Sequence, residues 1–418
     1  MVVLHFIPDL NAIKSSASLK YKTALLEAMA NSAEVHVLTL DKTGIHFENA
    51  TIKTYSPPHT LRRNMRSFFA NTLSQCKPNI VHIHALWETQ AYKLFKECAR
   101  QHIPTVMTLD HKLDKWHMRQ GYRLQKLPKL LLHRQRMLVD AGALHFVTTQ
   151  EYSNFLSFTA LYRPKGGLPL NKRCTIVKPF NISWGTNAND MSRRLLALYQ
   201  KTVDSFPFYS MDDDERHMED LLLALGRPHG NAGIPFTAED AALAESMDGK
   251  SWRRIFLHSS DEGILDYVKA GAKTAGAAMP TIEVGKIDRF MPDARNAAHG
   301  TERRRSKSKA RKIQSDSSMP PFEKELCALI ATVLHKTVNA TVRRADLAEM
   351  CKTLETNEYD EGLVSGKLRD LGLLGDAARL LQIMKERYRL SEGFMFTDPL
   401  DDRKTGKIRK KLYKSKVQ

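Results

Sequence analysis

The segment PNIVHIHALW, residues 78–87, decides how the first part of this chain is expected to fold. It is a short apolar run that lies between the polar pairs Lys77–Pro78 and Glu88–Thr89, a pattern that predicts a buried strand. Residues 89–101 follow with apolar side chains at helical spacing, and residues 103–111 predict a second strand. Strand, helix and strand in this order form the βαβ unit of a parallel sheet.

The same alternation continues towards the N-terminus. Apolar and alternating runs predict strands at residues 2–7, 34–40 and 45–55, and helical spacing predicts helices at 19–29 and 61–76. This spacing is typical of a Rossmann-like, doubly wound parallel sheet. Ligands of such open sheets bind outside the carboxyl ends of the strands, so chemistry is expected at that edge.

Polar side chains gather at the expected carboxyl ends of these strands. His82 and His84 alternate along one strand and should therefore face the same side. A buried core role is expected for His82, whereas His84 lies nearer the strand end and is the better candidate for chemistry. Asp110 and His111 follow the next strand, with Trp87 close by. The pair Asp110 and His111 can form part of a site, but it fits a helix cap or a surface pair equally well.

The segments PNIVHIHALW (78–87) and IPTVMTLDH (103–111) resemble the N-terminal domain of the retaining GT-B glycosyltransferases that build bacterial cell-surface polysaccharides. Residues 140–151 and 174–181 are similar to later strands of that domain, and the resemblance covers about residues 1–185. The chain departs from the family in two places. The family has histidine before aspartate where this chain has Asp110 before His111, and it has paired glycines in the loop that is residues 10–19 here.

The resemblance implies transfer of a sugar from a nucleotide-sugar donor to a glycan or lipid-linked acceptor, with retention and without a required metal or cofactor. It implies that His84, Asp110 and His111 line the catalytic site. A positive group can stabilise the departing diphosphate, and Lys178 is the candidate for that role.

The loop after the first strand is a second candidate binding segment. Its residues Lys14, Ser15 and Ser16 offer hydroxyls, an amine and a helix N-terminus to an anion. The alternative is that Ser18 simply caps the following helix.

A complete donor site is not evident beyond residue 185. Glu262 and Gly263 resemble the first half of the family's donor motif, and Glu262 is the candidate donor-binding residue. Ala270 stands where the second carboxylate is required. Residues 255–257 are expected to end a strand and 261–269 to form a helix. The acidic run 212–215 can bind a metal or, as expected here, begin a helix whose dipole favours negative charge.

Four domains are expected along the chain. They are the Rossmann-like domain at 1–185, a divergent middle domain at 186–290 that is a shortened α/β or helical region, a disordered basic linker at 291–321, and a helical bundle with a basic tail at 322–418. Two short helices near residues 343–370 bear a weak likeness to a helix-turn-helix.

The charge of +18 is concentrated in three acid-free runs, at residues 115–139, 303–312 and 403–418. Their charges sum to +22, and subtracting this from +18 leaves −4 for the rest of the chain. Nucleic-acid binding is therefore not expected. The run at 115–139 interleaves basic, aromatic and leucine residues, which suits either an anionic membrane surface or a solvated helix face.

The five widely spaced cysteines exclude a disulfide framework and a zinc motif of cysteines, which fits a reducing cytosol. Neither a signal peptide nor a transmembrane segment is expected, so the chain is expected in the cytoplasm or peripherally at the inner membrane face. The function expected first is that of an atypical glycosyltransferase of bacterial cell-surface polysaccharide synthesis. The alternative is a non-catalytic, glycosyltransferase-derived module that binds a partner through its helical C-terminal domain.

Overall fold

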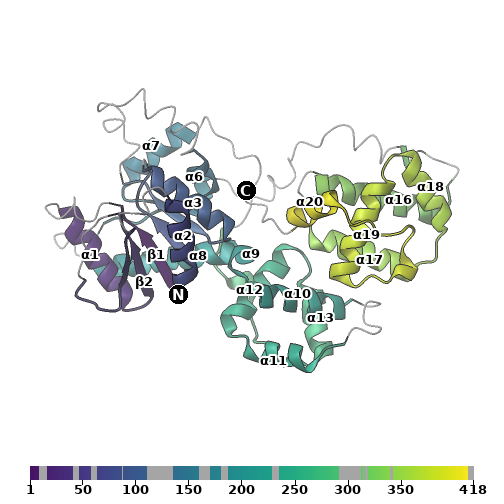
Figure 1. Cartoon of the computed structure of the whole chain (residues 1–418), viewed down its shortest axis with the longest axis horizontal. Coiled ribbons are helices and arrows are strands. Elements are labelled where there is room, and N and C mark those ends of the chain that lie inside the picture. Colours follow the sequence, from purple (N-terminus) through teal and green to yellow (C-terminus); the bar gives the residue numbers. More distant parts are fainter. Residues whose placement is uncertain are drawn as a thin grey trace. The chain divides into compact units, whose positions relative to one another are not determined.

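The computed structural model describes residues 1–8, 17–40, 47–57, 64–86, 88–110, 135–159, 170–179, 187–227, 235–290, 312–313, 315, 319–338 and 342–412. It forms two compact units (Figure 1). We call them the sheet unit, Met1–Ser210 with Asp288–Asp293, and the helical unit, Met211–Ile287 with Ala294–Lys416.

The sheet unit is built on seven parallel strands in the order β3-β2-β1-β4-β5-β6-β7. This arrangement confirms the α/β class and is consistent with a Rossmann-like fold. The strands are β1 (Val2–Phe6), β2 (Glu34–Leu38), β3 (Lys53–Tyr55), β4 (Ile80–Ile83), β5 (Thr105–Thr108), β6 (Ala143–Phe146) and β7 (Cys174–Ile176).

The strand predicted at 45–55 is wrong for most of its described length. Only Lys53–Tyr55 pairs with β2. Asn49 turns the chain before it, because its side chain accepts hydrogen bonds from the backbone N–H and the hydroxyl of Thr51 at 3.0 and 2.7 Å. Asparagine favours such local turns over a strand.

Helices cover both faces of the sheet (Figure 1). On one face, α1 (Ala17–Ala30) and α8 (Ala188–Ser205) pack on residues such as Val3, Val37 and Val106. The opposite face packs Leu4, Phe6 and Val81 against a second set of helices. These are α2 (Met65–Cys76), α3 (Thr89–Arg100), α6 (Gln135–Asp140) and α7 (Thr149–Thr159). Neighbouring residues of one strand thus enter two separate cores, as the period of a strand requires.

In the described part of the helical unit every regular element is a helix. The longer ones are α10 (Asp213–Leu225), α11 (Ala238–Ser246), α12 (Gly249–Asp261), α13 (Leu265–Ala275), α16 (Pro321–Val338), α17 (Arg344–Thr356), α18 (Glu361–Asp370), α19 (Leu374–Tyr388) and α20 (Arg403–Leu412). The short helical turns of the sheet unit are η3 (Leu170–Arg173) and α9 (Pro207–Ser210). Those of the helical unit are η5 (Val284–Lys286) and η6 (Glu392–Phe394).

The strand end predicted at residues 255–257 is wrong, because these residues lie inside α12. Asp248 begins this helix by accepting hydrogen bonds from the backbone N–H groups of Lys250 and Ser251. Trp252, Ile255 and Phe256 then follow at helical spacing and are buried in the core. The prediction that the acidic run 212–215 begins a helix is confirmed. Asp212 caps α10, and its side chain accepts a hydrogen bond from the Glu215 N–H at 2.8 Å.

The division of the chain also differs from the predicted one. One apolar core contains residues of α10, α12 and α13 together with residues of α16 to α19, so the predicted middle and C-terminal domains form a single unit. The predicted boundary near residue 185 falls before α8, which buries Leu195 and Tyr199 in the core of the sheet unit. Helices α10 and α13 approach closely at Gly271, where a Cβ atom would lie 1.9 Å from the Leu222 carbonyl oxygen.

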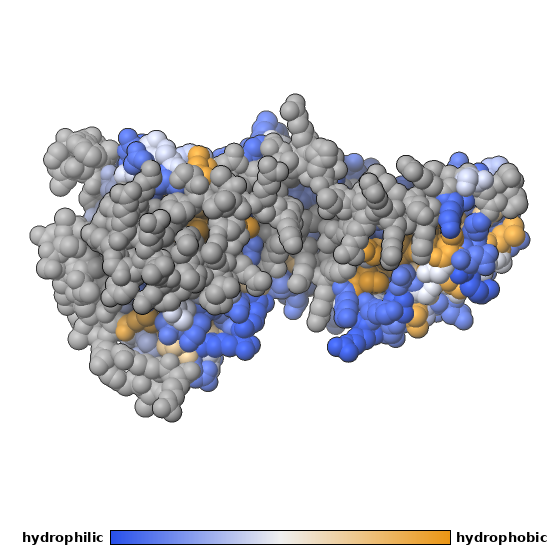
Figure 2. Space-filling view, turned by 90° about the horizontal axis from the view of Figure 1, so that it is seen from above, coloured by the Kyte–Doolittle hydropathy of each residue, from blue (hydrophilic) through white to orange (hydrophobic). Residues whose placement is uncertain are grey.

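The described surface is hydrophilic over much of the view in Figure 2, with hydrophobic areas between the hydrophilic ones. Within the described ranges, the exposed large apolar side chains are Leu156, Val338, Leu363, Phe394 and Leu400. Among the described residues, no helix has both the length and the apolar character that crossing a bilayer requires.

Candidate functional site

A polar stripe crosses the sheet on the face that α1 and α8 cover. His5 of β1 stands in register with His82 of β4, and Thr108 of β5 stands in register with His145 of β6. These four side chains are buried, and His84, just beyond the end of β4, is half-buried. The predicted shared side of His82 and His84 is confirmed, because their ring centroids lie 3.9 Å apart.

The donors and acceptors of the hydrogen bonds in this stripe can be assigned from one end, at the Val177 carbonyl. The Val177 carbonyl oxygen can only accept, so His145 donates to it from Nε2 at 3.0 Å. Burial lowers the pKa of His145 to about 4, which leaves the ring neutral. Its Nδ1 atom therefore carries a lone pair and accepts the hydroxyl proton of Thr108 at 2.7 Å.

The same rule then fixes the protonation of His82. Thr108 has used its only proton, so its oxygen accepts from His82 Nε2–H at 2.6 Å. Burial and the neighbouring histidines His84, His5 and His145 hold the pKa of His82 well below its usual value. A neutral ring with a proton on Nε2 has a lone pair on Nδ1, and this atom accepts from the Tyr199 hydroxyl at 2.5 Å.

His84 is held by its neighbour His5. Burial lowers the pKa of His5 to about 3, and its Nε2–H donates to the Met29 sulfur at 3.4 Å. His5 Nδ1 therefore accepts from His84 Nε2–H at 3.0 Å. Burial, followed by the charges of His5 and Lys22, also holds the pKa of His84 well below its usual value, which leaves a lone pair on His84 Nδ1. Among the described residues none bonds to this nitrogen.

Lys22 and Asp110 form an ion pair at the same edge of the sheet. Lys22 Nζ lies 3.4 Å from Asp110 Oδ2, and the Lys22 side chain is 9% exposed whereas that of Asp110 is 37% exposed. Asp110 follows β5 and adopts a left-handed conformation with φ +48°, which an L residue rarely takes outside turns and functional sites. The predicted residues His84 and Asp110 thus both lie at the carboxyl edge of adjacent strands, β4 and β5.

Several predicted site residues lie outside the described residues. These are Lys14, Ser15, Ser16, His111 and Trp87, and most of the basic stretch 115–139 and of the linker 291–321. Lys178 is described, and it lies exposed just beyond β7 and next to Val177.

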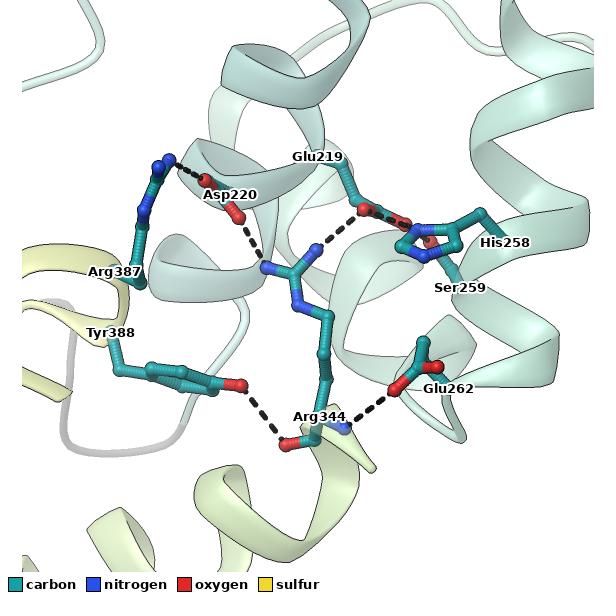
Figure 3. Close-up of polar contacts among 8 residues, drawn as sticks. All are labelled: Glu219, Asp220, His258, Ser259, Glu262, Arg344, Arg387 and Tyr388. Atoms are coloured by element: carbon teal, nitrogen blue, oxygen red, sulfur yellow. Dashed lines mark hydrogen bonds and ion pairs between the residues drawn. The ribbon is translucent and has the colours of Figure 1, made fainter. Parts of the chain in front are cut away.

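Glu262 belongs to the helical unit, where it ends α12 (Figure 3). Its carboxylate accepts a hydrogen bond from the backbone N–H of Arg344 at 2.8 Å, at the start of α17. The Glu262 carbonyl oxygen also accepts from Ala345 N–H at 3.0 Å. This residue therefore holds one helix end against another.

Figure 3 shows that Glu262 borders a buried ionic network. Glu219 accepts hydrogen bonds from His258 Nδ1 at 2.7 Å and from the Ser259 hydroxyl at 2.6 Å, and it pairs with Arg344. Arg344 also pairs with Asp220, which binds Arg387 at 2.6 Å. We call these residues, with Glu262, the ionic network.

The ionic network sets the protonation of its members. Burial works to raise the pKa of Glu219, but the charges of His258 and Arg344 outweigh it and hold that pKa at about 2. Burial works to lower the pKa of His258, but the charge and hydrogen bond of Glu219 outweigh it and raise that pKa. His258 is therefore favoured in its charged form.

His5, Thr108, His145 and Tyr199 were not singled out from the sequence. The available signal was a polar residue inside an apolar strand, as in VVLHF at 2–6. The strand register that brings these side chains together cannot be read from a local sequence pattern. The prediction of no metal site concerned cysteine spacing and the family resemblance, and it overlooked the cluster of His5, His82 and His84. One nitrogen from each ring lies within 4.8 Å of the other two.

No protein-family model, no curated protein and no solved structure matches this chain.

Proposed function

We propose that the sheet unit binds a hydroxyl-rich, sugar-like ligand at the carboxyl edge of its sheet, and that the chain is a non-catalytic, glycosyltransferase-derived binding module. The observation that carries this proposal is the half-buried His84, whose Nδ1 lone pair is set by the bond from Nε2–H to His5. A neutral imidazole nitrogen in this state accepts a hydrogen bond from a hydroxyl group.

The neighbouring ion pair complements that acceptor. Lys22 supplies N–H donors and Asp110 supplies carboxylate acceptors, so adjacent hydroxyls of one ligand find both kinds of partner. A small number of oriented polar groups at the edge of an open sheet is the usual form of a ligand site in such folds.

The structural role of Glu262 favours binding without transfer. The donor-binding carboxylate expected from the resemblance is Glu262, which accepts the Arg344 N–H within the ionic network and so holds the start of α17 against the end of α12. In this proposal the helical unit contacts a protein partner, and the sheet unit supplies the sugar-binding site.

The test is a thermal-shift and calorimetric screen of the full chain against free sugars, oligosaccharides and UDP-, GDP- and CMP-sugars. A ligand at 100 times its dissociation constant stabilises the fold by about 2.7 kcal/mol. We expect stabilisation by a free sugar or oligosaccharide, lost in His84→Ala and kept in the control His217→Ala, whose side chain is 54% exposed in the helical unit. A folded protein that responds to no sugar, or a His84→Ala variant that binds as well as the wild type, would refute the proposal.

A second candidate, sugar transfer from a nucleotide-sugar donor to a glycan or lipid-linked acceptor, is favoured by Lys178. Its exposed amine follows β7 at the carboxyl edge, where it can neutralise a diphosphate. Saturable binding of one nucleotide sugar, weakened by Lys178→Gln, with release of the nucleotide in the presence of an acceptor, would establish this candidate in place of the first.

A further inference from the structure

We propose that His5, His82 and His84 bind one transition-metal ion, with zinc(II) the best match to three imidazole ligands. This site does not rest on the sugar-binding proposal, but the two share His84. The metal takes the Nε2 atom of His84 and leaves the proton on Nδ1, so the metal-bound ring does not accept a sugar hydroxyl at Nδ1. One nitrogen atom from each ring lies within 4.8 Å of the other two. Imidazole nitrogens are ordinary ligands of zinc, and three of them leave a fourth position for water or a ligand oxygen.

Hydrogen bonds on the far side of two rings select the metal-binding nitrogen. His82 donates from Nε2–H to Thr108, and this direction follows from the Val177 carbonyl through His145. The remaining lone pair of His82 is therefore on Nδ1. In metal sites the histidine ligand commonly donates its other N–H to a neighbouring acceptor, which fixes the tautomer and the ring orientation.

His5 follows the same rule. Its Nε2–H donates to the Met29 sulfur, so its lone pair is on Nδ1 and is directed at His84. His84 Nε2 lies 3.0 Å from this atom. Two nitrogens bound to one tetrahedral zinc at about 2.0–2.1 Å lie about 3.3 Å apart, so the His5 and His84 pair needs little adjustment.

Metal binding would change two hydrogen bonds and no net charge on the rings. The proton between His84 Nε2 and His5 Nδ1 moves to His84 Nδ1, so that His84 remains neutral and Nε2 becomes a ligand. The Tyr199 hydroxyl leaves His82 Nδ1, which it contacts at 2.5 Å. Metal ligands must be unprotonated at the bound atom, and burial already keeps these three rings neutral because it lowers the pKa of each.

The first test is a titration of the full chain, freed of metal by a chelator, with zinc(II) against a competing chromophoric chelator and with cobalt(II) by visible absorption. We expect one equivalent per folded chain and an intense tetrahedral cobalt spectrum. His84→Gln removes the only one of the three ligands that is half-buried rather than buried, so the fold should tolerate it. This variant should weaken zinc binding at least tenfold. The control His217→Gln removes a histidine of the helical unit and should leave binding unchanged. Absence of stoichiometric binding by the folded wild type, or equal affinity of His84→Gln, would overturn the proposal.

Substitution of the buried His5 or His82 can unfold the sheet unit, so a second variant tests the buried ligands without removing them. Tyr199→Phe deletes the hydroxyl that competes with the metal for His82 Nδ1. If Nδ1 is a ligand, this variant should bind zinc severalfold more tightly than the wild type. Unchanged or weaker binding by a folded Tyr199→Phe protein would contradict the assignment of His82. Circular dichroism of each variant confirms that the folded protein is being compared.

Discussion

The polar stripe of the sheet unit and the ionic network of the helical unit bury histidines in opposite states. In the sheet unit, burial lowers the pKa of His5 to about 3 and that of His145 to about 4. His258 of the helical unit is buried as well, but its pKa is raised because the Glu219 carboxylate outweighs the cost of burial. Burial alone therefore does not decide the charge of a histidine; the polarity of its partners does.

The partners differ in kind between the two places. The histidines of the polar stripe bond to one another or to neutral groups, namely Tyr199, Thr108, Met29 and the Val177 carbonyl. In the ionic network the carboxylates of Glu219 and Asp220 pair with Arg344 and Arg387, and Glu219 also holds the protonated His258. The following predictions test whether this distinction between a neutral and an ionic interior is correct.

The largest effect is expected from Arg344→Met in the ionic network. It leaves Glu219 and Asp220 without their shared cation, and breaking a buried ion pair on one side costs about 3–5 kcal/mol. Urea unfolding of the full chain, read by hydrogen exchange of peptides from α10 and α12, measures this loss. The control Arg343→Met removes the neighbouring exposed arginine and should cost little. A loss below about 1 kcal/mol in Arg344→Met would mean that the ionic network contributes no net stability.

Thr108→Val tests the neutral interior and should have the next largest effect. It removes the acceptor for His82 Nε2–H and the donor to His145 Nδ1, so that two buried polar atoms lose their partners at about 1–3 kcal/mol each. Thr108→Ser keeps the hydroxyl and loses only a methyl group, so it is the matched control. We expect Thr108→Val to be at least 2 kcal/mol less stable than Thr108→Ser, on the order of two unsatisfied groups. Equal stability of the two variants would show that the hydrogen-bond chain is not formed as described.

Above about pH 5.5, where carboxylates stay ionised, the two units should respond to pH with opposite signs. The folded sheet unit keeps His5 and His145 neutral below pH 6.5 while the unfolded chain takes up protons, so its stability falls as the pH drops from 6.5 towards 4 and 3. The folded helical unit keeps His258 protonated above pH 6.5 while the unfolded chain releases the proton, so its stability falls as the pH rises through the raised pKa. Each histidine contributes a slope of up to about 1.4 kcal/mol per pH unit.

Hydrogen exchange corrected for the intrinsic rate at each pH separates the two responses. Peptides from β4 report the sheet unit and peptides from α12 report the helical unit. The variant His258→Gln should remove the high-pH loss in α12 and leave β4 unchanged. Parallel pH profiles in the two units of the wild type above about pH 5.5, where carboxylates such as Glu219 stay ionised in both states, would contradict the comparison.

The architecture of the sheet unit was readable from the sequence because its signals are local. Apolar runs bounded by turn residues predicted β1, β2, β4 and β5, and all four are confirmed. The same kind of signal failed at residues 255–257, since a short apolar run fits a strand and a buried helix equally. There the caps and spacing of a longer segment decide, with Asp248 beginning α12 and Trp252 buried within it.

The candidate site was readable only in part, because its contacts join distant positions. His84 and Asp110 were predicted from their places after strands, and both lie at the expected edge. Tyr199, however, lies 117 residues from His82 along the chain, and no local pattern encodes that pairing. The role of Glu262 was hidden for the same reason, because its partner Arg344 lies 82 residues away.

The smallest effect is expected from Lys22→Gln, which separates charge from burial within the sheet unit. The charge of Lys22 contributes to lowering the pKa of His82 and His84, but burial is the larger cause for both. Removing this charge should therefore raise the pKa of His84 by a fraction of a unit and leave it well below 6.5, as an NMR titration of the ring protons would measure.

Lys93→Gln is the control for that measurement, because it removes an equal charge from an exposed position on α3, which covers the opposite face of the sheet. It should leave the pKa of His84 unchanged. If Lys22→Gln instead returned the pKa of His84 to about 6.5, charge rather than burial would hold this ring neutral. The two units would then differ only in the sign of the nearest charge, and the neutral interior would not be a distinct environment.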